Sequence, residues 1–196
     1  MPRAGLTEAR VVAEAELLAD EVGLSSLTLA ALAQRLGARQ PSLYKHVSGM
    51  EGLRRSIALR AKLELAGVFG RAAIGRSGDD AVVAMSHAYR RWALEHPGRY
   101  SSTVRAPVLG DSEDEAASLA AVQVVSEVMA GYELRGDDAV DAIRGLRSAL
   151  HGFVSLESAG GFVPVDVDRS FERLVRGLAA TLSNWVAATS SRPSLG

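Results

Sequence analysis

The chain has 196 residues, of which 47% are hydrophobic and 5% aromatic, a formal net charge of −1 at pH 7 and no cysteine. This length suffices for a small head and a larger body with a real core, and the lack of cysteine excludes disulfides, thiolate metal sites and cysteine nucleophiles. No apolar run reaches the roughly 18 residues of a membrane span, and the first residues lack the apolar segment of a signal peptide. We therefore expect a cytoplasmic protein that does not contact a membrane.

Apolar residues recur at intervals of three and four along most of the chain, and β-branched residues never alternate as they do in strands. The sequence therefore predicts an all-α fold. A first helix should begin after Thr7, whose hydroxyl can cap it, and end at Gly23. A second should begin after Thr28 in the same way. The turn Gly37-Ala38 then separates it from a third, which should extend to Val47.

Ser48 and Glu51 have the spacing of a capping box, which predicts a long helix from Gly49 to about Ala73. This helix is long enough to join an N-terminal three-helix head, residues 1–50, to a larger helical body, residues 51–196. In the body, glycines, prolines and acidic residues mark the ends of further elements. These are a helix from Asp79 or Asp80 to His96, a short helix or loop over residues 99–109, a helix from the acidic run at 111–115 to Gly131, and two long helices, Asp138 to Ser158 and Ser170 to Thr189.

The near-neutral net charge hides an asymmetry along the chain. Residues 1–65 contain nine Lys and Arg against seven Asp and Glu, and residues 66–196 contain thirteen against sixteen, so the two parts carry +2 and −3. From Arg35 to Lys62, seven cations accompany Glu51 alone. A local charge of +6 indicates a polyanion partner at this end of the chain.

The third predicted helix has a polar outer face, and only Leu43 and Val47 point inward. Arg and Gln side chains can read guanine and adenine edges in the major groove, while hydroxyls and cations hold phosphates. These residue types therefore indicate a DNA-reading helix-turn-helix, although a solvated helix face is the plainer alternative. The predicted DNA-binding residues are Thr28, Arg39, Gln40, Ser42, Tyr44, Lys45, His46 and Arg54.

The order of residues points to a known family. The segment GARQPSLYKHVSGMEGL at residues 37–53, preceded by LAALA at 29–33 and followed by His96-Pro97, resembles the TetR family of bacterial transcriptional repressors. Many members have Phe where this chain has Val47, and a phosphate-contacting Lys where it has Met50. The segment LHGFVSLE at residues 150–157 resembles the subgroup whose C-terminal domain is named for a Trp-His-Gly motif, with Leu150 in place of the Trp.

This resemblance implies a homodimeric DNA-binding transcriptional regulator, a repressor that binds a partly palindromic operator and is released by a small-molecule effector, without a cofactor. The two recognition helices would read half-sites about 34–36 Å apart. The family pairs its subunits through the last two long helices, which here carry near-heptad apolar stripes and a strip of small residues, Gly145, Ala149 and Gly152. The alternative is that these stripes only pack on the body of the same subunit. The predicted dimer-interface residues are Ile143, Leu146, Leu150, Phe171, Leu174, Leu178, Leu182 and Trp185.

The resemblance also implies an effector pocket among the helices between head and interface. Methionine and aromatic residues at helical spacing are the candidates, although the same pattern is typical of plain core. His87 and His151 are expected to be hydrogen-bonded core residues, since no second metal ligand stands near either. The predicted pocket residues are Phe69, Met85, Tyr89, Trp92, Tyr100, Val122, Val125, Met129 and Phe153.

Two other functions remain open at this point. One is a helix-turn-helix activator or architectural DNA-binding protein without a small ligand. The other is an α-helical enzyme, against which the sequence shows no serine elbow, glycine-rich phosphate loop, HExxH motif or paired carboxylates on one helix face. We therefore predict no catalytic and no metal-binding residue.

Overall fold

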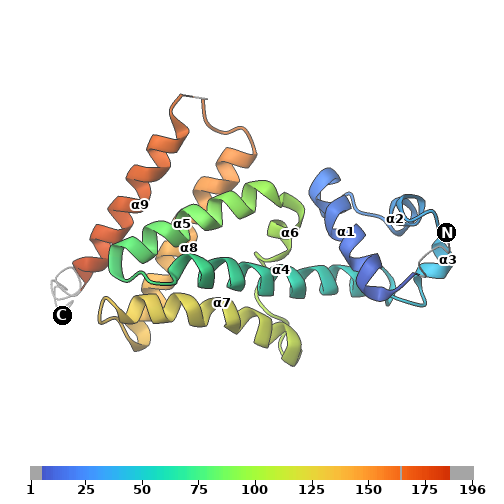
Figure 1. The fold of residues 1–196 in the computed structure, drawn as a ribbon, viewed down its shortest axis with the longest axis horizontal. Coiled ribbons are helices and arrows are strands. Elements are labelled where there is room, and N and C mark those ends of the chain that lie inside the picture. The colour runs from blue at the N-terminus through green and yellow to red at the C-terminus, as the bar shows by residue number, and fades with distance from the viewer. Residues whose placement is uncertain (1–5, 164, 186–196) are drawn as a thin grey trace, which may run out of the picture. The chain divides into compact units, whose positions relative to one another are not determined.

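The computed structural model describes residues 6–163 and 165–185, which form nine α-helices and no strand (Figure 1). The predicted all-α fold is confirmed. Within the described residues no helix combines the length and the apolar character needed to cross a bilayer. The helices are α1 Glu8–Val22, α2 Leu29–Arg35, α3 Gln40–Leu43, α4 Gly49–Ala73, α5 Gly78–Glu95, α6 Pro97–Ser102, α7 Ser112–Ala130, α8 Gly136–Ser158 and α9 Val167–Ser183.

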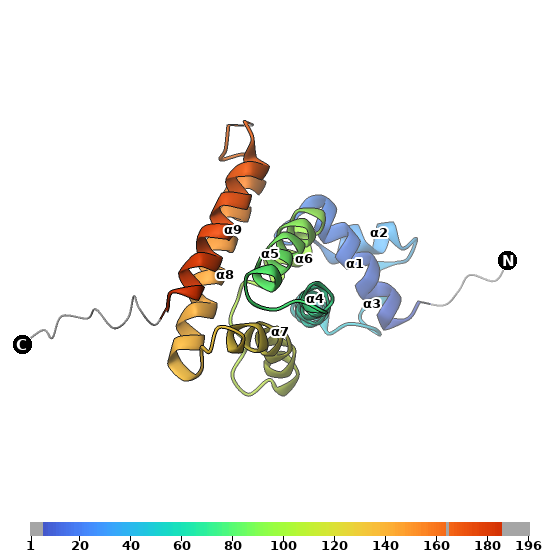
Figure 2. The same ribbon diagram turned by 60° about the vertical axis from the view of Figure 1, so that its left-hand side comes forward.

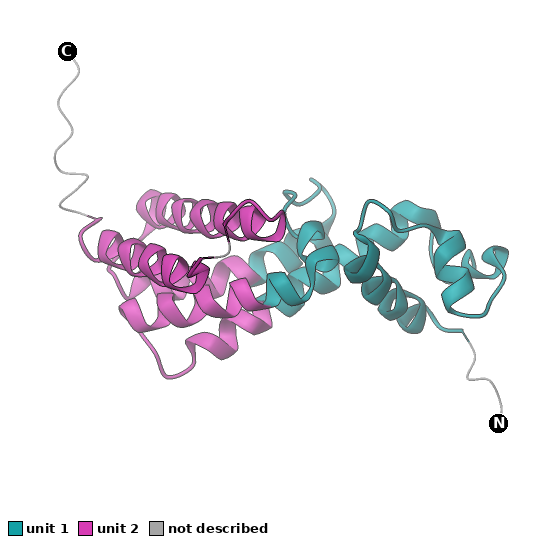
Figure 3. Cartoon of the chain, turned by 90° about the horizontal axis from the view of Figure 1, so that it is seen from above, with its two compact units in different colours: residues 1–65, 92–120 teal, residues 66–91, 121–196 magenta. Residues whose placement is uncertain are grey.

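The chain divides into two compact units (Figure 3). The first unit consists of residues 1–65 and 92–120, and the second unit of residues 66–91 and 121–196. Helices α4, α5 and α7 each contribute residues to both units. These units do not coincide with the head and body expected from the sequence, because α6 and the first half of α7 fold together with the head. A functional boundary between residues 50 and 51 stays a prediction.

Local signals placed the helix ends well. The Thr7 hydroxyl accepts a 3.3 Å hydrogen bond from the Arg10 N–H, and the Thr28 hydroxyl accepts a 3.1 Å bond from the Ala31 N–H. Gly23 ends α1 with a φ of 85°, in the region that favours glycine. The described part of α9 ends before the predicted Thr189, which lies outside the described residues.

The third helix is shorter than predicted. Regular helix α3 ends at Leu43, and residues 44–46 form a turn closed by a 2.9 Å hydrogen bond from the His46 N–H to the Leu43 carbonyl. The chain tightens here because α4 starts at Gly49, only two residues after the buried Val47. Helix α4 has the predicted bounds and follows Ser48 directly, while the side-chain bonds of the capping box stay a prediction.

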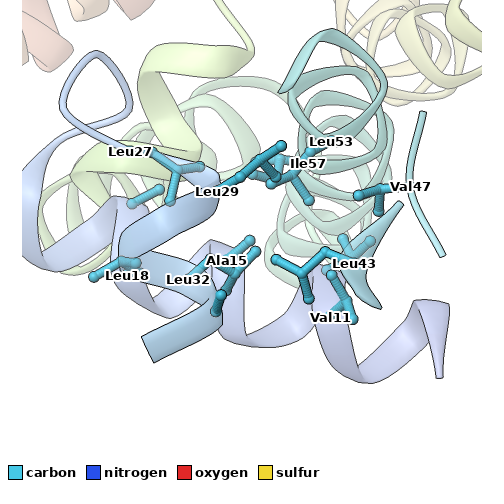
Figure 4. Close-up of a cluster of buried hydrophobic side chains, with 13 residues drawn as sticks. Val11, Ala15, Leu18, Leu27, Leu29, Leu32, Leu43, Val47, Leu53 and Ile57 are labelled. Carbon is cyan, nitrogen blue, oxygen red and sulfur yellow. The ribbon is translucent and has the colours of Figure 1, made fainter. Parts of the chain in front are cut away.

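The head of the first unit is built around one hydrophobic cluster (Figure 4). Side chains from α1, α2, α3 and the start of α4 point toward one another, with Leu27 and Val47 added from the segments between helices. The cluster contains Val11, Val12, Ala15, Leu18, Ala19, Leu27, Leu29, Leu32, Ala33, Leu43, Val47, Leu53 and Ile57. Helix α3 and the turn after it are therefore held to the head by two buried side chains, Leu43 and Val47.

Replacing Leu32 with alanine should lower the free energy of unfolding of the head by about 2–5 kcal/mol, because the Leu32 side chain is fully buried and its removal leaves a cavity. Urea unfolding followed by circular dichroism measures the change. Leu17→Ala on α1 is the control, since Leu17 is 47% exposed and its loss should cost about 0.5 kcal/mol or less. Equal losses for the two variants would contradict the description of this core.

In the second unit, α8 and α9 run side by side (Figures 1 and 2). Each helix has one buried stripe at intervals of three and four residues. The stripe consists of Ala142, Leu146, Leu150 and Val154 on α8 and of Phe171, Val175, Ala179 and Leu182 on α9. The indole Nε1 of Trp185 donates a 3.2 Å hydrogen bond to Asp138, and this bond joins the end of the α9 segment to the start of α8.

Candidate nucleic-acid interface

A tight turn connects α2 to the residues predicted to read DNA. Gly37 has a φ of 63°, a conformation that most side chains avoid. The Ala38 N–H donates to the Ala33 carbonyl at 2.9 Å, which closes the end of α2. The chain then enters α3 at Arg39, and Pro41 lies in the first turn, where its missing N–H costs nothing. This arrangement is a helix-turn-helix.

We call residues 39–46 the recognition segment. Its buried side chain is Leu43, and Val47 follows as a second anchor. The side chains of Arg39, Gln40, Tyr44 and Lys45 are exposed, and Tyr44 is 57% exposed although it is aromatic. Ser42 and His46 are half-buried. The structure thus brings six of the eight predicted DNA-binding residues together on one short segment.

The two remaining predicted residues lie on other elements. The Thr28 hydroxyl caps α2 as an acceptor, so its hydrogen is still available to a phosphate oxygen. Arg54 is exposed on α4 and borders an open pocket within the first unit. This pocket is lined by Asp20, Glu21, Gly23, Leu24, Ser25, Arg54, Pro97 and Ser101. The contact of Arg54 with DNA stays a prediction.

Most cations of the basic segment are already paired inside the protein, which sequence reasoning did not foresee. Among the seven from Arg35 to Lys62, four form ion pairs with carboxylates of the first unit. The pairs are Arg35 with Glu14 and Glu21, Arg55 with Asp111 and Glu113, Arg60 with Glu16, and Lys62 with Asp114. The local charge of +6 is therefore largely neutralised, and these four cations hold helices together.

Two of these pairs show how strong the internal neutralisation is. Lys62 Nζ donates to Asp114 Oδ1 at 2.5 Å, and both side chains are buried. Arg55 donates two 2.6 Å hydrogen bonds to the carboxylate of Asp111, which lowers the pKa of Asp111 to about 2. The partners stand about fifty residues apart in the sequence, so no local pattern could have identified them.

Three cations of this segment have no ion-pair partner among the described residues: Arg39, Lys45 and Arg54. All three are exposed. Two of them stand in the recognition segment beside Gln40 and Tyr44. Free cations next to flat polar side chains can contact phosphates and base edges together. The charge available to DNA is thus concentrated on the predicted recognition element.

The predicted effector-pocket residues occupy different environments. Tyr89 stacks on Phe69 in the second unit, with 6.1 Å between the ring centroids. The indole N–H of Trp92, in the first unit, is buried without a hydrogen-bond acceptor among the described residues. Whether these residues line a pocket stays a prediction. Met85, Tyr89, Trp92, Tyr100, Val125 and Met129 are buried, Phe69 and Phe153 are half-buried, and Val122 is 42% exposed.

The predicted dimer-interface residues fall into two groups. Leu146, Leu150, Phe171 and Leu182 are buried within the protomer and have almost no surface to offer a partner. The stripes that these four residues belong to pack within the protomer, and their part in a dimer interface stays a prediction. Ile143, Leu174, Leu178 and Trp185 are only half-buried, so apolar surface remains on this group.

His87 was expected to be a hydrogen-bonded core residue. Its Nε2 lies 2.7 Å from a carboxylate oxygen of Glu172, and its ring packs edge-on against Phe171, but its side chain is still 41% exposed. Within residues 6–163 and 165–185, no cluster of three or more His, Cys, Asp or Glu side chains could hold a metal ion.

Comparisons with known proteins agree with this geometry. The family model described as "Tetracyclin repressor-like, C-terminal domain" matches residues 82–178. An HTH-type transcriptional regulator of Mycobacterium tuberculosis is 42% identical over 90% of this chain and 82% of its own length. The HTH-type regulator YobS of Bacillus subtilis is 35% identical over 82% and 84%.

Two solved structures share the fold. A TetR variant from Acinetobacter baumannii in complex with minocycline has a TM-score of 0.70 and is 22% identical, covering 92% of this chain and 98% of its own. ActR from Streptomyces coelicolor, without ligand, has a TM-score of 0.68 and is 19% identical, covering 95% and 99%.

Proposed function

The chain belongs to the TetR family of helix-turn-helix transcriptional regulators, and we propose that it is a homodimeric repressor that leaves its operator when a small-molecule effector binds. It is a DNA-binding regulator and not an enzyme. The observation that carries the proposal is the recognition segment, where Arg39, Gln40, Tyr44 and Lys45 are exposed above the buried anchor Leu43. In a dimer, two such segments would read the halves of a palindrome.

Helix α9 has a second apolar stripe beside the buried one, and this stripe supports dimerisation. Leu174, Leu178 and Trp185 recur at intervals of four and seven residues and are half-buried. On α8, Gly145 and Gly152 lie on one face with Ala149, and a Cβ built on either glycine would meet no atom within 4 Å. Small residues on an open face allow a partner helix to approach closely.

The small-residue face of α8 and the second apolar stripe of α9 would lie on the same side of the α8–α9 pair. Asp138 precedes Gly145 by seven residues and therefore shares its face of α8. The hydrogen bond from Trp185 to Asp138 joins this face to the second stripe of α9. The small residues of α8 and the half-buried leucines of α9 would thus form one continuous surface for a second protomer.

Release by an effector is supported by one unused hydrogen-bond donor in the first unit. The buried indole N–H of Trp92 lacks an acceptor among the described residues, and such groups are costly to leave unpaired. An effector with an apolar body and one hydrogen-bond acceptor would satisfy it. To move DNA binding from 99:1 to 1:99, the effector must favour the released state by about 5.5 kcal/mol across the dimer.

Footprinting on the intergenic DNA next to the gene tests the proposal. We expect one short palindrome to be protected, and a compound library to contain a ligand that removes the protection. A footprint that no compound affects would support a regulator without a small ligand. Absence of any footprint, with no duplex enriched from a random pool, would contradict sequence-specific binding.

The salt dependence of DNA binding should report how many unpaired cations contact phosphates. Arg39, Lys45 and Arg54 of both protomers would give a slope of log K against log salt of about −5. Lys45→Ala should make this slope less steep by about 2 in the dimer. Arg55→Gln is the control and should leave the slope unchanged, because Arg55 is paired with Asp111 and Glu113. A larger effect from Arg55 than from Lys45 would contradict the assignment. Fluorescence anisotropy at several salt concentrations measures both.

A further inference from the structure

Helices α1 and α4 of the first unit make two charged contacts with their surroundings, which lie one helical turn apart along each helix. Glu16 and Asp20 stand four residues apart on α1, and Arg60 and Glu64 stand four residues apart on α4. Residues at this spacing share one face of a helix. The first contact, between Glu16 and Arg60, is an ordinary ion pair, in which Arg60 donates to Glu16 at 2.8 Å.

The second contact, one turn further along both helices, is different, because α1 contributes Asp20 and α4 contributes Glu64, which are both carboxylates. Arg99, whose backbone lies on α6, binds both Asp20 and Glu64. The Arg99 backbone N–H and Nε donate to the two oxygens of Asp20 at 2.8 and 2.7 Å, and Nη1 donates to Glu64 at 2.8 Å. Nη2 lies 2.6 Å from Nδ1 of His96, which must accept because a guanidinium only donates. We call the trio Asp20, Arg99 and Glu64 the latch.

Asp20 and Arg99 of the latch are largely buried, whereas Glu64 is 38% exposed, and α6 fits closely against α1. The side chains of Asp20 and Arg99 are only 12% and 13% exposed. Burial alone would lower the pKa of Arg99, but the hydrogen bond to Asp20 and the nearby carboxylates outweigh it and raise the pKa. Arg99 therefore stays protonated. Gly98 brings α6 against α1, since a Cβ on Gly98 would lie 2.1 Å from the Ala19 carbonyl oxygen. Only glycine allows this approach.

We propose that Arg99 is a positioning residue for DNA binding, which converts a repulsion between α1 and α4 into an attraction and so fixes the angle at which the recognition segment is held. With Arg99 in place, the two carboxylates share one cation. Without it, like charges face each other across the helices. Because α1 shares the head core with α2, α3 and the start of α4, a change in the angle between α1 and α4 reorients the recognition segment.

Charge rescue tests this role directly. Arg99→Met should reduce affinity for a duplex that the wild-type protein enriches from a random pool by about 10-fold. It should also weaken the preference for the correct half-site spacing over duplexes with one or two extra central base pairs. Adding Glu64→Gln removes the repulsion and should restore most of both properties. A loss that Glu64→Gln does not rescue would show lost packing alone and would overturn the proposal.

A second readout does not depend on DNA. The chain has no cysteine, so Ala9→Cys on α1 and Leu63→Cys on α4, both exposed and both in the first unit, take spin labels cleanly. Labelled protomers are diluted with unlabelled ones. The distance distribution should broaden or shift in Arg99→Met and return in Arg99→Met/Glu64→Gln. Gly98→Ala should reproduce the Arg99→Met result, because it displaces α6 from α1.

Arg90→Met is the matched control. Arg90 is also 13% exposed and also bridges two carboxylates, Glu157 and Asp168, but it lies in the second unit. It should leave the α1–α4 label distances unchanged. An unchanged distribution in Arg99→Met would overturn the latch. The spacing test rests on the proposed dimeric function, so a wild-type protein without any spacing preference would contradict that function, while the label distances would still decide on Arg99.

Discussion

Replacing Arg39 and Tyr44 together with alanine is expected to abolish retardation of the operator in a gel while the dimer stays intact. A bidentate contact between an arginine and a guanine contributes about 1–3 kcal/mol of discrimination. Because each protomer of a dimer would lose it, affinity should fall by about 100-fold or more. Tyr44 is 57% exposed and does not belong to the buried head cluster, so its loss removes a contact surface without opening the core.

The control for this experiment is Arg91→Ala, which removes an exposed arginine of the second unit. It should leave operator affinity within a factor of about two, as for surface substitutions away from the interface. Sedimentation and circular dichroism should show the same dimer and the same helicity for both proteins. If the Arg39/Tyr44 variant retains operator binding, the recognition segment does not read DNA.

The second large effect concerns the dimer. Changing Leu174 and Leu178 together to glutamate should give monomers, because four carboxylates would be buried without partners where the α9 stripes of two protomers meet. The monomer would lose the second half-site, and operator affinity should fall by about 100-fold or more, since half of the phosphate and base contacts disappear. Analytical ultracentrifugation measures the first effect and anisotropy the second.

Val140→Glu serves as the control, because Val140 is 42% exposed on α8 but lies away from the face of Gly145 and Gly152. It should leave the dimer intact. If Val140→Glu dissociates the protein while the double leucine variant stays dimeric, the partner binds elsewhere on the α8–α9 pair.

Sequence reasoning located the parts of the fold that depend on local chemistry. Thr7 and Thr28 cap their helices, Gly23 and Gly37 end them, and α4 has the predicted bounds. These features are set by hydrogen bonds and backbone conformations within a few residues of one another. The same is true of the anchors Leu43 and Val47, which follow from helical spacing.

Long-range features were not accessible in this way. The pairing of Arg55 with Asp111 and of Lys62 with Asp114 depends on how α4 packs against residues 103–120. Counting charges along the sequence therefore overstated the positive charge that is available to bind DNA. Similarly, His96-Pro97 was recognised as the end of a helix and as part of the family resemblance, whereas the contact between α6 and α1 that Gly98 allows was not foreseen.

Periodicity also could not separate two neighbouring stripes on one helix. Phe171 and Leu182 on α9 lie less than one residue's rotation from Leu174 and Leu178, and all four satisfy the same spacing rule. Only the packing of the protomer shows that the first pair is buried inside it and the second pair is not. An amphipathic pattern gives the apolar side of a helix but does not say which chain covers it.

Selection of duplexes from a random pool by the wild-type protein tests the central claim most directly. A dimer that reads DNA through two recognition segments should enrich a palindrome whose half-sites are about one helical turn apart or a multiple of it. Repeating the selection with Arg39→Ala should relax the sequence preference at one symmetric pair of positions. Enrichment of a single asymmetric motif, or the same motif with and without Arg39, would contradict the account.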